Sequence, residues 1–150
     1  MIGRLIMTRE EFLVYMNHFN NKEYDGLTKY FADDIVVEYF DNFVLEKQTP
    51  KVLHGKDAFV ANYMSLHSTV REFLDLGFCL FDGEHLIVEL YTEFHALVDT
   101  EFTAGMMKKG DVFSVTNWVC YDFDKDGKFK RIRIAHFIVH DTPPRFDPGT

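Results

Sequence analysis

Residues 85–99 alternate between apolar and polar side chains, a pattern that predicts one long β-strand. One face of this strand carries mostly apolar residues: Leu86, Val88, Leu90, Thr92, Phe94, Ala96 and Val98. The other face carries Glu89, Tyr91, Glu93 and His95. On such an apolar strand, ionisable side chains would line a cavity that contains some polar groups, face water or contact a second subunit. The functional interpretation depends on which of these holds.

Helical periodicity dominates the first half of the chain. Thr8-Arg-Glu-Glu11 is a capping box, and the helix that it begins places Phe12, Tyr15, Met16 and Phe19 on one inward stripe. A shorter helix is predicted over about 24–31, a strand over 35–40 and a third helix from 55 to about 67. Between this strand and the third helix, residues 41–53 are predicted to form a loop long enough to cover a neighbouring part of the domain.

The second half is strand-like. Residues 71–81 and 85–98 are predicted to pair across Asp82-Gly83, and 112–123 and 129–140 across Asp124-Lys-Asp-Gly127. The tail from 142 is irregular and is expected on the surface. Three N-terminal helices followed by a run of strands predict a single α+β domain over 1–150, with the helices packed on one face of a curved, mainly antiparallel sheet.

Composition narrows the class of protein. The 150-residue chain has a net charge of −8, and its one basic cluster, residues 128–133, falls on a hairpin, so no nucleic-acid partner is expected. No window approaches the ~18 apolar residues of a membrane span, and no secretory leader is recognised, so a cytoplasmic protein is expected. Cys79 and Cys120 lie in apolar runs, which favours buried free thiols over a disulfide. Sixteen phenylalanines and seven tyrosines imply an aromatic core or an aromatic-lined pocket.

Four short sequence segments, in their order along the chain, resemble the SnoaL-like, nuclear-transport-factor-2-like superfamily. They are Tyr30-Phe-Ala-Asp-Asp34 before Ile-Val-Val-Glu, His54-Gly-Lys-Asp57 at a helix start, Asp82-Gly83 before the long strand, and Asp126-Gly-Lys-Phe129 before the last strand. The resemblance covers nearly the whole chain and implies a cone of three helices and a curved sheet. It implies little about chemistry, because this fold hosts isomerases, dehydratases, cyclases, epoxide hydrolases and binding modules.

Comparison with the ketosteroid isomerases of that superfamily is more specific. Tyr15 matches their oxyanion-hole tyrosine and Tyr63 a supporting tyrosine, whereas Tyr39 stands at the position of the base and Val119 at that of the acid. Steroid-type isomerisation is therefore not expected, but an aromatic pocket with phenol donors is. The same register turns six further side chains inward: Asn117, Val119, Tyr121, Ile132, Ile134 and His136. An ungapped extension also turns Glu89, Tyr91, Glu93 and His95 inward.

Glu93 and His95 are the leading candidates for chemistry. Two residues apart on one strand face, their side chains would lie within roughly 7 Å of each other. A carboxylate beside an imidazole raises the histidine pKa and orients the ring, which suits general acid or base catalysis. His136 would be the complementary catalytic group, in a style that resembles scytalone dehydratase. The predicted substrate-binding residues are Tyr15, Tyr39, Tyr63, Tyr91, Asn117, Val119 and Tyr121.

Simpler interpretations stand beside these. Glu93 and His95 could face solvent or a partner subunit, His136 could be a core histidine, and Tyr15 and Tyr63 could serve packing alone. His54 is expected to be structural, and His18 and His67 to be exposed at helix ends. No metal site is expected from Glu93, His95 and His136, and no phosphate-binding loop or nucleophile motif indicates a cofactor or a covalent mechanism.

The leading hypothesis is a cofactor-independent lyase or isomerase that performs dehydration, cyclisation or a double-bond shift on a hydrophobic polyketide-, terpenoid- or steroid-type molecule. The rival hypothesis is a ligand-binding or dimerisation module with the same fold and no turnover. Epoxide hydrolysis is less favoured, because the long strand has Glu and His where Asp and Arg would be needed. A homodimer formed through the sheet is expected from the resemblance.

Overall fold

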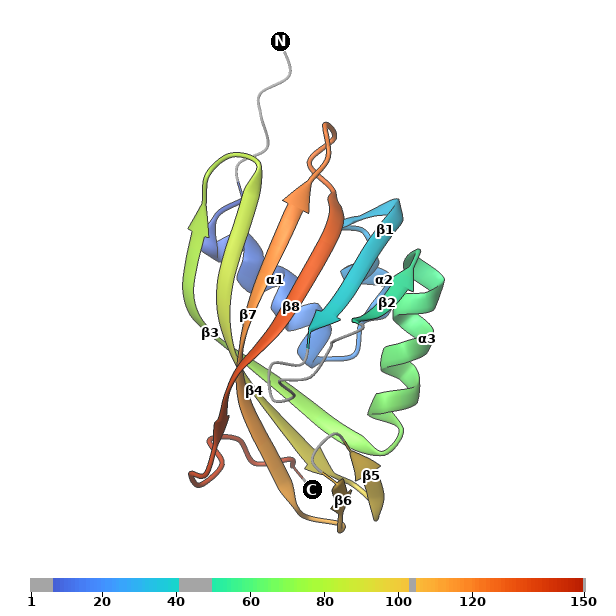
Figure 1. The fold of residues 1–150 in the computed structure, drawn as a ribbon, viewed down its shortest axis with the longest axis vertical. Coiled ribbons are helices and arrows are strands. Elements are labelled where there is room, and N and C mark those ends of the chain that lie inside the picture. Colours follow the sequence, from blue (N-terminus) through green and yellow to red (C-terminus); the bar gives the residue numbers. More distant parts are fainter. Residues whose placement is uncertain (1–6, 41–49, 103–104, 150) are drawn as a thin grey trace.

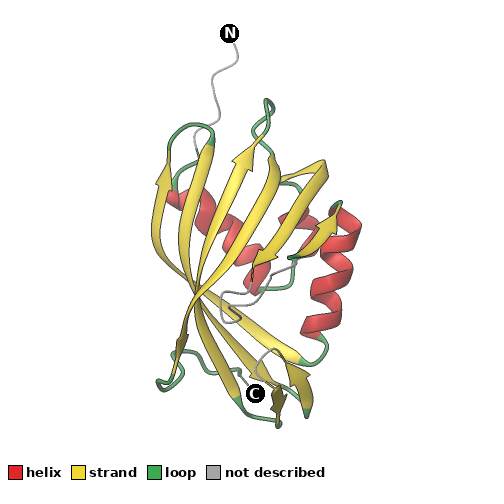
Figure 2. Ribbon diagram, in the orientation of Figure 1, coloured by secondary structure: helices red, strands yellow, loops and turns green. Residues whose placement is uncertain are grey.

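The computed structural model describes residues 7–40, 50–102 and 105–149. Helices α1 (Arg9–Asn20), α2 (Tyr24–Thr28) and α3 (Lys56–His67) pack on one side of a curved six-stranded sheet (Figures 1 and 2). This arrangement confirms the predicted α+β fold class. No helix in the described part of the chain is long and apolar enough to cross a membrane.

The sheet is built from six strands in the spatial order β2-β1-β8-β7-β4-β3. Their bounds are β1 Phe31–Phe40, β2 Lys51–His54, β3 Val70–Phe81, β4 His85–Ala96, β7 Val112–Phe123 and β8 Phe129–His140. Strands β1 and β8 run parallel, and the other neighbouring pairs run antiparallel. Strands β5 (Thr100–Phe102) and β6 (Gly105–Met107) form a separate two-stranded sheet.

Local sequence signals explain these bounds. The Thr8 hydroxyl accepts a hydrogen bond from the Glu11 amide at 3.1 Å, which caps α1 as the sequence predicts. The Asp82 carboxylate accepts the backbone amides of Glu84 and His85 in the first hairpin. Gly83 adopts a positive φ of 102° there, a conformation that glycine tolerates best.

The boundary differences have physical causes. The second helix ends at Thr28, not near 31, because Phe31 pairs with Phe129 at the start of the parallel β1–β8 ladder. Of the predicted loop 41–53, residues 41–49 lie outside the described residues, and 51–54 form β2 on the sheet edge. The long strand ends at Ala96, because the amides of Leu97 and Gly110 bond to neighbouring loop and strand carbonyls instead.

Aromatic rings fill the space between α1 and the sheet. Tyr15 meets Phe129 edge-on with ring centroids 5.2 Å apart, and Tyr121 lies 4.7 Å from the same Phe129 ring. Phe12, Phe31 and Phe129 have essentially no exposed surface. Burial of several rings in edge-on contact adds stabilisation beyond the area removed from water. Aromatic residues therefore supply this part of the core, and others line the cavity described next.

Candidate functional site

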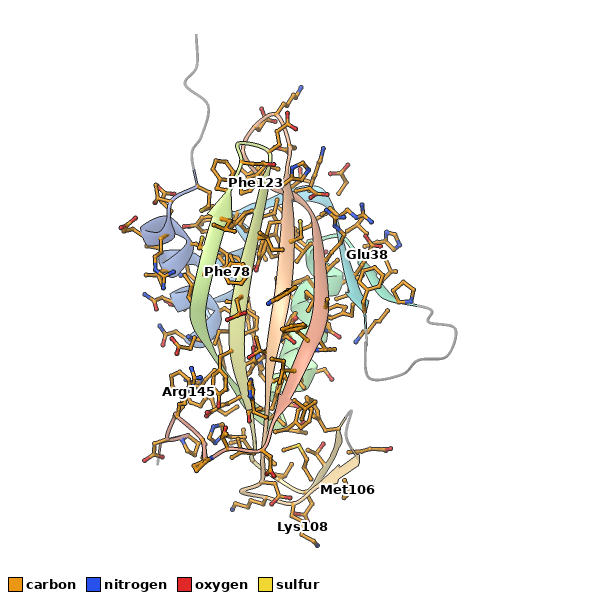
Figure 3. All side chains as sticks on the ribbon, turned by 60° about the vertical axis from the view of Figure 1, so that its left-hand side comes forward. Glu38, Phe78, Met106, Lys108, Phe123 and Arg145 are labelled. Carbon is orange, nitrogen blue, oxygen red and sulfur yellow. The ribbon has the colours of Figure 1, made fainter. Side chains whose placement is uncertain are left out.

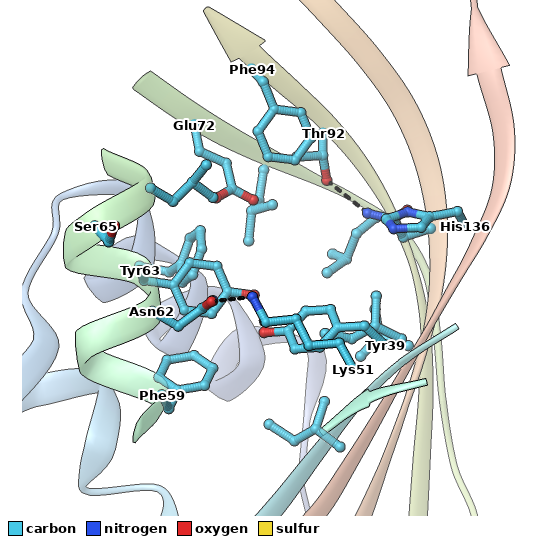
Figure 4. A pocket seen from close by; sticks show the side chains of 18 of the residues that line it. Tyr39, Lys51, Phe59, Asn62, Tyr63, Ser65, Glu72, Thr92, Phe94 and His136 are labelled. Carbon is cyan, nitrogen blue, oxygen red and sulfur yellow. Dashed lines mark hydrogen bonds between the residues drawn. The ribbon is translucent and has the colours of Figure 1, made fainter. Parts of the chain in front are cut away.

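A cavity of about 890 Å³ lies between α3 and the concave face of the sheet (Figure 4). Its walls are largely apolar and include Phe19, Phe59, Leu66, Leu74, Leu90 and Ile132. Seven of the ten candidate catalytic and substrate-binding residues line it: Tyr15, Tyr39, Tyr63, Asn117, Val119, Tyr121 and His136. A cavity of this size and lining is typical of sites for small apolar ligands. The binding and catalytic roles of these residues stay predictions.

Two phenol groups form a pair in the cavity. The Tyr39 hydroxyl on β1 donates a hydrogen bond to the Tyr63 hydroxyl on α3 at 2.7 Å. Burial raises the pKa of Tyr39 and of Tyr63, and the nearby Glu72 carboxylate raises both further. Both phenols therefore stay protonated at neutral pH. Because Tyr39 donates to Tyr63, the Tyr63 proton is available to a ligand oxygen.

Glu72 brings a carboxylate to the same cavity. It stands on β3 with only 8 % of its surface exposed. Its Oε1 atom lies 3.0 Å from Nε2 of His67, and Nδ1 of His67 lies 2.7 Å from the Tyr24 hydroxyl. Burial raises the pKa of Glu72, and the hydrogen bond and charge interaction with His67 offset part of that rise. A carboxyl group with a raised pKa suits proton transfer near neutral pH.

A second polar group of side chains occupies the sheet side of the cavity. Asn117 Nδ2 donates to the Thr92 hydroxyl at 3.4 Å, and Asn117 Oδ1 lies 2.7 Å from Nδ1 of His136. Figure 4 labels Thr92 and His136 on this side of the cavity. Because an amide oxygen only accepts, Nδ1 of His136 carries the hydrogen in this bond. In the neutral ring Nε2 is then the basic nitrogen, so His136 can act as a proton acceptor.

The predicted inward orientation of Tyr91, Glu93 and His95 is wrong. Leu90, Thr92 and Phe94 line the cavity, so the residues between them point from the opposite face of β4. The side-chain period of a strand is two, so an error of one residue in register exchanges its faces. The structure brings neither Glu93 nor His95 to the cavity, and Glu89 and Tyr91 share their outer face.

The C-terminal tail covers this outer cluster. Glu93 is fully buried, and its carboxylate accepts the Tyr91 hydroxyl at 2.6 Å and lies 2.8 Å from Nε2 of His95. It also accepts the backbone amides of Arg145 and Phe146. Burial alone would raise the pKa of Glu93, but these hydrogen bonds together hold it below its ordinary value. Glu93 therefore anchors the tail.

Two ring contacts complete the attachment of the tail. The Arg145 guanidinium lies 3.7 Å from the centroid of the Tyr91 ring, and Phe146 stacks on Phe73 at 5.1 Å. Figure 3 shows Arg145 at the tail and Phe78 farther along the sheet. The tail is irregular and mostly exposed, as predicted, yet its contacts exclude solvent from Glu93.

Sequence reasoning missed Glu72 and misplaced His67. His67 was expected to be exposed, but only 6 % of its surface is, because Phe19 and Glu72 pack against it. The available signal was the alternation of β3, where Glu72 shares a face with Val70, Leu74 and other buried apolar residues. An acid at an apolar position is a candidate functional group.

The structure also describes the two cysteines and the side chains that could bind a metal ion. Cys79 and Cys120 are free and half-buried. Among the described residues, no group of His, Cys, Asp or Glu side chains is arranged to hold a metal ion.

Comparison with known proteins identifies the family. The model of the SnoaL-like domain matches residues 13–132. The chain belongs to the SnoaL-like domain family. No curated protein sequence matches it.

Solved structures with the same fold include an epoxide hydrolase and a protein in complex with a steroid ester. The proposed polyketide cyclase of Xanthomonas campestris pv. campestris is 17 % identical with a TM-score of 0.64, over 83 % of this chain and 85 % of that one. RV0760c of Mycobacterium tuberculosis, in complex with estradiol-17beta-hemisuccinate, is 16 % identical with a TM-score of 0.61, over 81 % and 87 %. An LEH-like epoxide hydrolase of the same organism is 13 % identical with a TM-score of 0.61, over 84 % and 79 %. At these identities the likeness shows the fold of the SnoaL-like chain and not its reaction.

Proposed function

We propose that this SnoaL-like protein is a cofactor-independent lyase or isomerase that acts on a hydrophobic small molecule by general acid–base catalysis. The observation that carries this proposal is the placement of Glu72. A buried carboxylate with a raised pKa lines the same apolar cavity as the Tyr39–Tyr63 hydroxyl pair. A base and an oxyanion donor that line the same cavity are the groups that proton transfer beside a carbonyl requires.

The roles follow from the contacts. A carbonyl oxygen of the substrate accepts the Tyr63 proton, and Tyr39 supports that donor through its 2.7 Å hydrogen bond. Glu72 removes a proton from the neighbouring carbon, and the developing negative charge on the oxygen is stabilised by the phenols. His136, from the other side of the cavity, first takes up a proton from water at Nε2 and then, in its protonated form, returns a proton to the substrate or protonates a leaving hydroxyl. A double-bond shift, a ring closure or a dehydration then depends on the substrate.

The substrate class is a cyclic or polycyclic molecule of polyketide, terpenoid or steroid type. The apolar walls and the volume of about 890 Å³ support a ligand of that size. The structurally similar RV0760c binds a steroid ester, and polyketide cyclisation is proposed for the Xanthomonas protein. Both observations belong to those proteins and support the proposed class for this one.

Turnover of a panel of hydrophobic cyclic ketones and polyketide-like β-ketones, followed by mass spectrometry and proton exchange, tests the function. Glu72→Gln is expected to lower the rate about 10²–10⁴-fold, because it removes the base. The matched control is Glu10→Gln on the exposed face of α1, which should keep full activity. Full activity in Glu72→Gln would refute the assignment of the base.

A non-catalytic binding module is the second candidate. The hydrogen bond between Glu72 and His67 favours it, because a buried pair of this kind also serves structure alone. This alternative predicts that a ligand binds in the cavity and is recovered unchanged, with equal affinity for the wild type and Glu72→Gln.

We also propose that two copies meet through the outer face of the sheet. Trp118 and Phe137 stack there with centroids 4.1 Å apart, and Phe78 meets Trp118 edge-on. All three are exposed, with the Arg133–Asp122 ion pair nearby. An aromatic patch flanked by charges of both signs can pack against the same patch of a second copy about a two-fold axis.

The free thiols fit a cytoplasmic setting, which we propose for the protein.

A further inference from the structure

Glu72 is the inner end of a hydrogen-bonded chain that crosses the wall of the cavity. Its carboxylate contacts Nε2 of His67 at 3.0 Å, and Nδ1 of His67 contacts the Tyr24 hydroxyl at 2.7 Å. The three residues come from β3, α3 and α2, and Glu72 and His67 are buried whereas Tyr24 is half-buried. The chain therefore leads from a carboxylate on the cavity to a phenol near the outer surface.

The His67 ring is held in one orientation. Phe19 meets it edge-on at 5.5 Å, Tyr63 lies 5.7 Å away, and Tyr24 stacks on it at 6.1 Å. Both ring nitrogens have hydrogen-bond partners at the same time. A ring fixed in this way cannot carry a proton by turning, so any proton it passes must enter at one nitrogen and leave at the other.

The chain has two self-consistent hydrogen-bond arrangements. With Glu72 ionised, Nε2–H of His67 donates to the carboxylate and the Tyr24 hydroxyl donates to Nδ1. With Glu72 protonated, the carboxyl donates to Nε2, Nδ1–H donates to the Tyr24 oxygen, and the Tyr24 hydroxyl donates to solvent. Each arrangement satisfies both ring nitrogens with a neutral imidazole.

One proton separates the two arrangements. Starting from protonated Glu72, the carboxyl O–H bond breaks as the Nε2–H bond forms. The Nδ1–H bond breaks as a new O–H bond forms at Tyr24, and the original Tyr24 hydroxyl proton passes to water. The balance is one proton moved from Glu72 to solvent, with His67 and Tyr24 neutral before and after. No oxidant, reductant or other co-reactant is needed.

We propose that His67 and Tyr24 form a proton relay that connects Glu72 with solvent on the outer side of α2. An apolar ligand that fills the cavity excludes water from Glu72 on that side, so the base needs another path to release the proton that it takes from the substrate. The relay supplies this path and adds to the proposed function, on which it rests. His67 and Tyr24 are positioning residues, since they act through Glu72.

The environment of Glu72 contains few competing groups. The titratable side chains that interact with it are His67 and Tyr63 of α3, Tyr39 of β1 and Tyr24 of α2. Burial keeps the pKa of Tyr39 and Tyr63 far above neutrality, so neither phenol ionises in the working range. The proton path from Glu72 therefore runs through His67, whose Nε2 contacts its carboxylate at 3.0 Å.

The test is the tautomer of His67, read from two-bond ¹H–¹⁵N spectra of the intact, histidine-labelled protein between about pH 4 and about pH 9. In the wild type, the Nε2 and Nδ1 shifts are expected to interchange as Glu72 titrates. In Tyr24→Phe the ring loses the acceptor for Nδ1–H, so the interchange should be lost and Nε2–H should persist. The matched control is Tyr30→Phe, which removes a half-buried hydroxyl that does not bond to His67 and should keep the interchange.

The wild-type titration decides the matter even where a variant fails to fold. A single His67 tautomer across the titration of Glu72 would overturn the relay, as would a doubly protonated ring beside an ionised Glu72. The measurement needs no substrate, so it separates the two proposals. Interchange in a protein that converts no substrate retains the proton path and removes the proposed function, whereas Glu72-dependent turnover with a fixed tautomer removes only the relay.

Discussion

Nε2 of His95 lies 2.8 Å from the Glu93 carboxylate on the outer face of the sheet, beneath the chain's own C-terminal tail. This pair resembles a catalytic carboxylate–imidazole couple, but it is sealed from the cavity by the sheet. Its partners are backbone amides of the tail, so its role is attachment.

Replacement of Glu93 tests this role. Glu93→Gln is expected to lower the free energy of unfolding by about 1.5–3 kcal/mol, because the amide accepts the tail amides without a charge. Urea denaturation measures the change, and proteolysis of residues 142–149 should become faster. Both Glu93→Gln and His95→Ala should leave any turnover intact, because neither side chain reaches the cavity. Loss of turnover at wild-type stability would contradict the assignment.

The same group predicts a pH dependence of stability. Hydrogen bonds hold the pKa of Glu93 below the ordinary value of 4.5, so its contribution to stability is fully present above about pH 4.5. It is lost as the pH falls through the folded-state pKa. Denaturation curves at a series of acidic pH values should show a shallower loss of stability in Glu93→Gln than in the wild type.

Glu72 should behave in the opposite way. Burial raises its pKa above 4.5, so the folded state holds this proton more tightly than the unfolded state. Stability is therefore lost as the pH rises from about 4.5 through the folded-state pKa. Glu72→Gln, which has no charge to bury, should gain stability relative to the wild type over that window while it loses activity. A variant that loses stability equally at every pH would indicate a purely structural carboxylate.

Tyr63 is expected to matter more to the reaction than to the fold. Tyr63→Phe keeps the ring contacts with Phe19 and Phe59 and removes the proposed oxyanion donor. We expect a loss of about 10²–10³-fold in kcat, the range found for removal of one oxyanion donor. Circular dichroism should confirm an unchanged fold, and Tyr30→Phe serves as the control. A change in KM alone would assign Tyr63 to binding.

The aromatic patch on the outer face predicts the state of assembly. Trp118→Glu should convert a dimer to a monomer in sedimentation equilibrium, because it places a charge at the centre of the proposed contact. Leu13→Glu, an exposed apolar position on α1, is the matched control. A wild-type protein that is monomeric at all concentrations would exclude this contact.

Sequence periodicity located the elements well where the signal is local. The capping box at Thr8 and the strands at 112–123 and 129–140 have the predicted bounds, because caps, hairpin turns and alternation are set by neighbouring residues. Alternation also separated the two faces of β4 correctly. It could not say which face meets the helices, since Glu93 is satisfied by amides more than fifty residues away.

The site was only half predictable for the same reason. Tyr15, Tyr39 and Tyr63 were placed by resemblance to the family, and they line the cavity. The group formed by Glu72, His67 and Tyr24 depends on three elements that meet only in the folded chain, so no local pattern indicates it. The sequence indicates this group only through Glu72, an acidic residue on an otherwise apolar face of β3.

The parallel pairing of β1 with β8 has a consequence for how the protein is made. Phe31 and Phe129, which lie far apart in the sequence, begin that ladder, and Tyr39 and Ile134 continue it beside the cavity. Contacts this distant in sequence form late and fold slowly. During synthesis, the edge of β1 that pairs with β8 stays unpaired until β8 has been made, so the cavity takes shape only after that strand emerges.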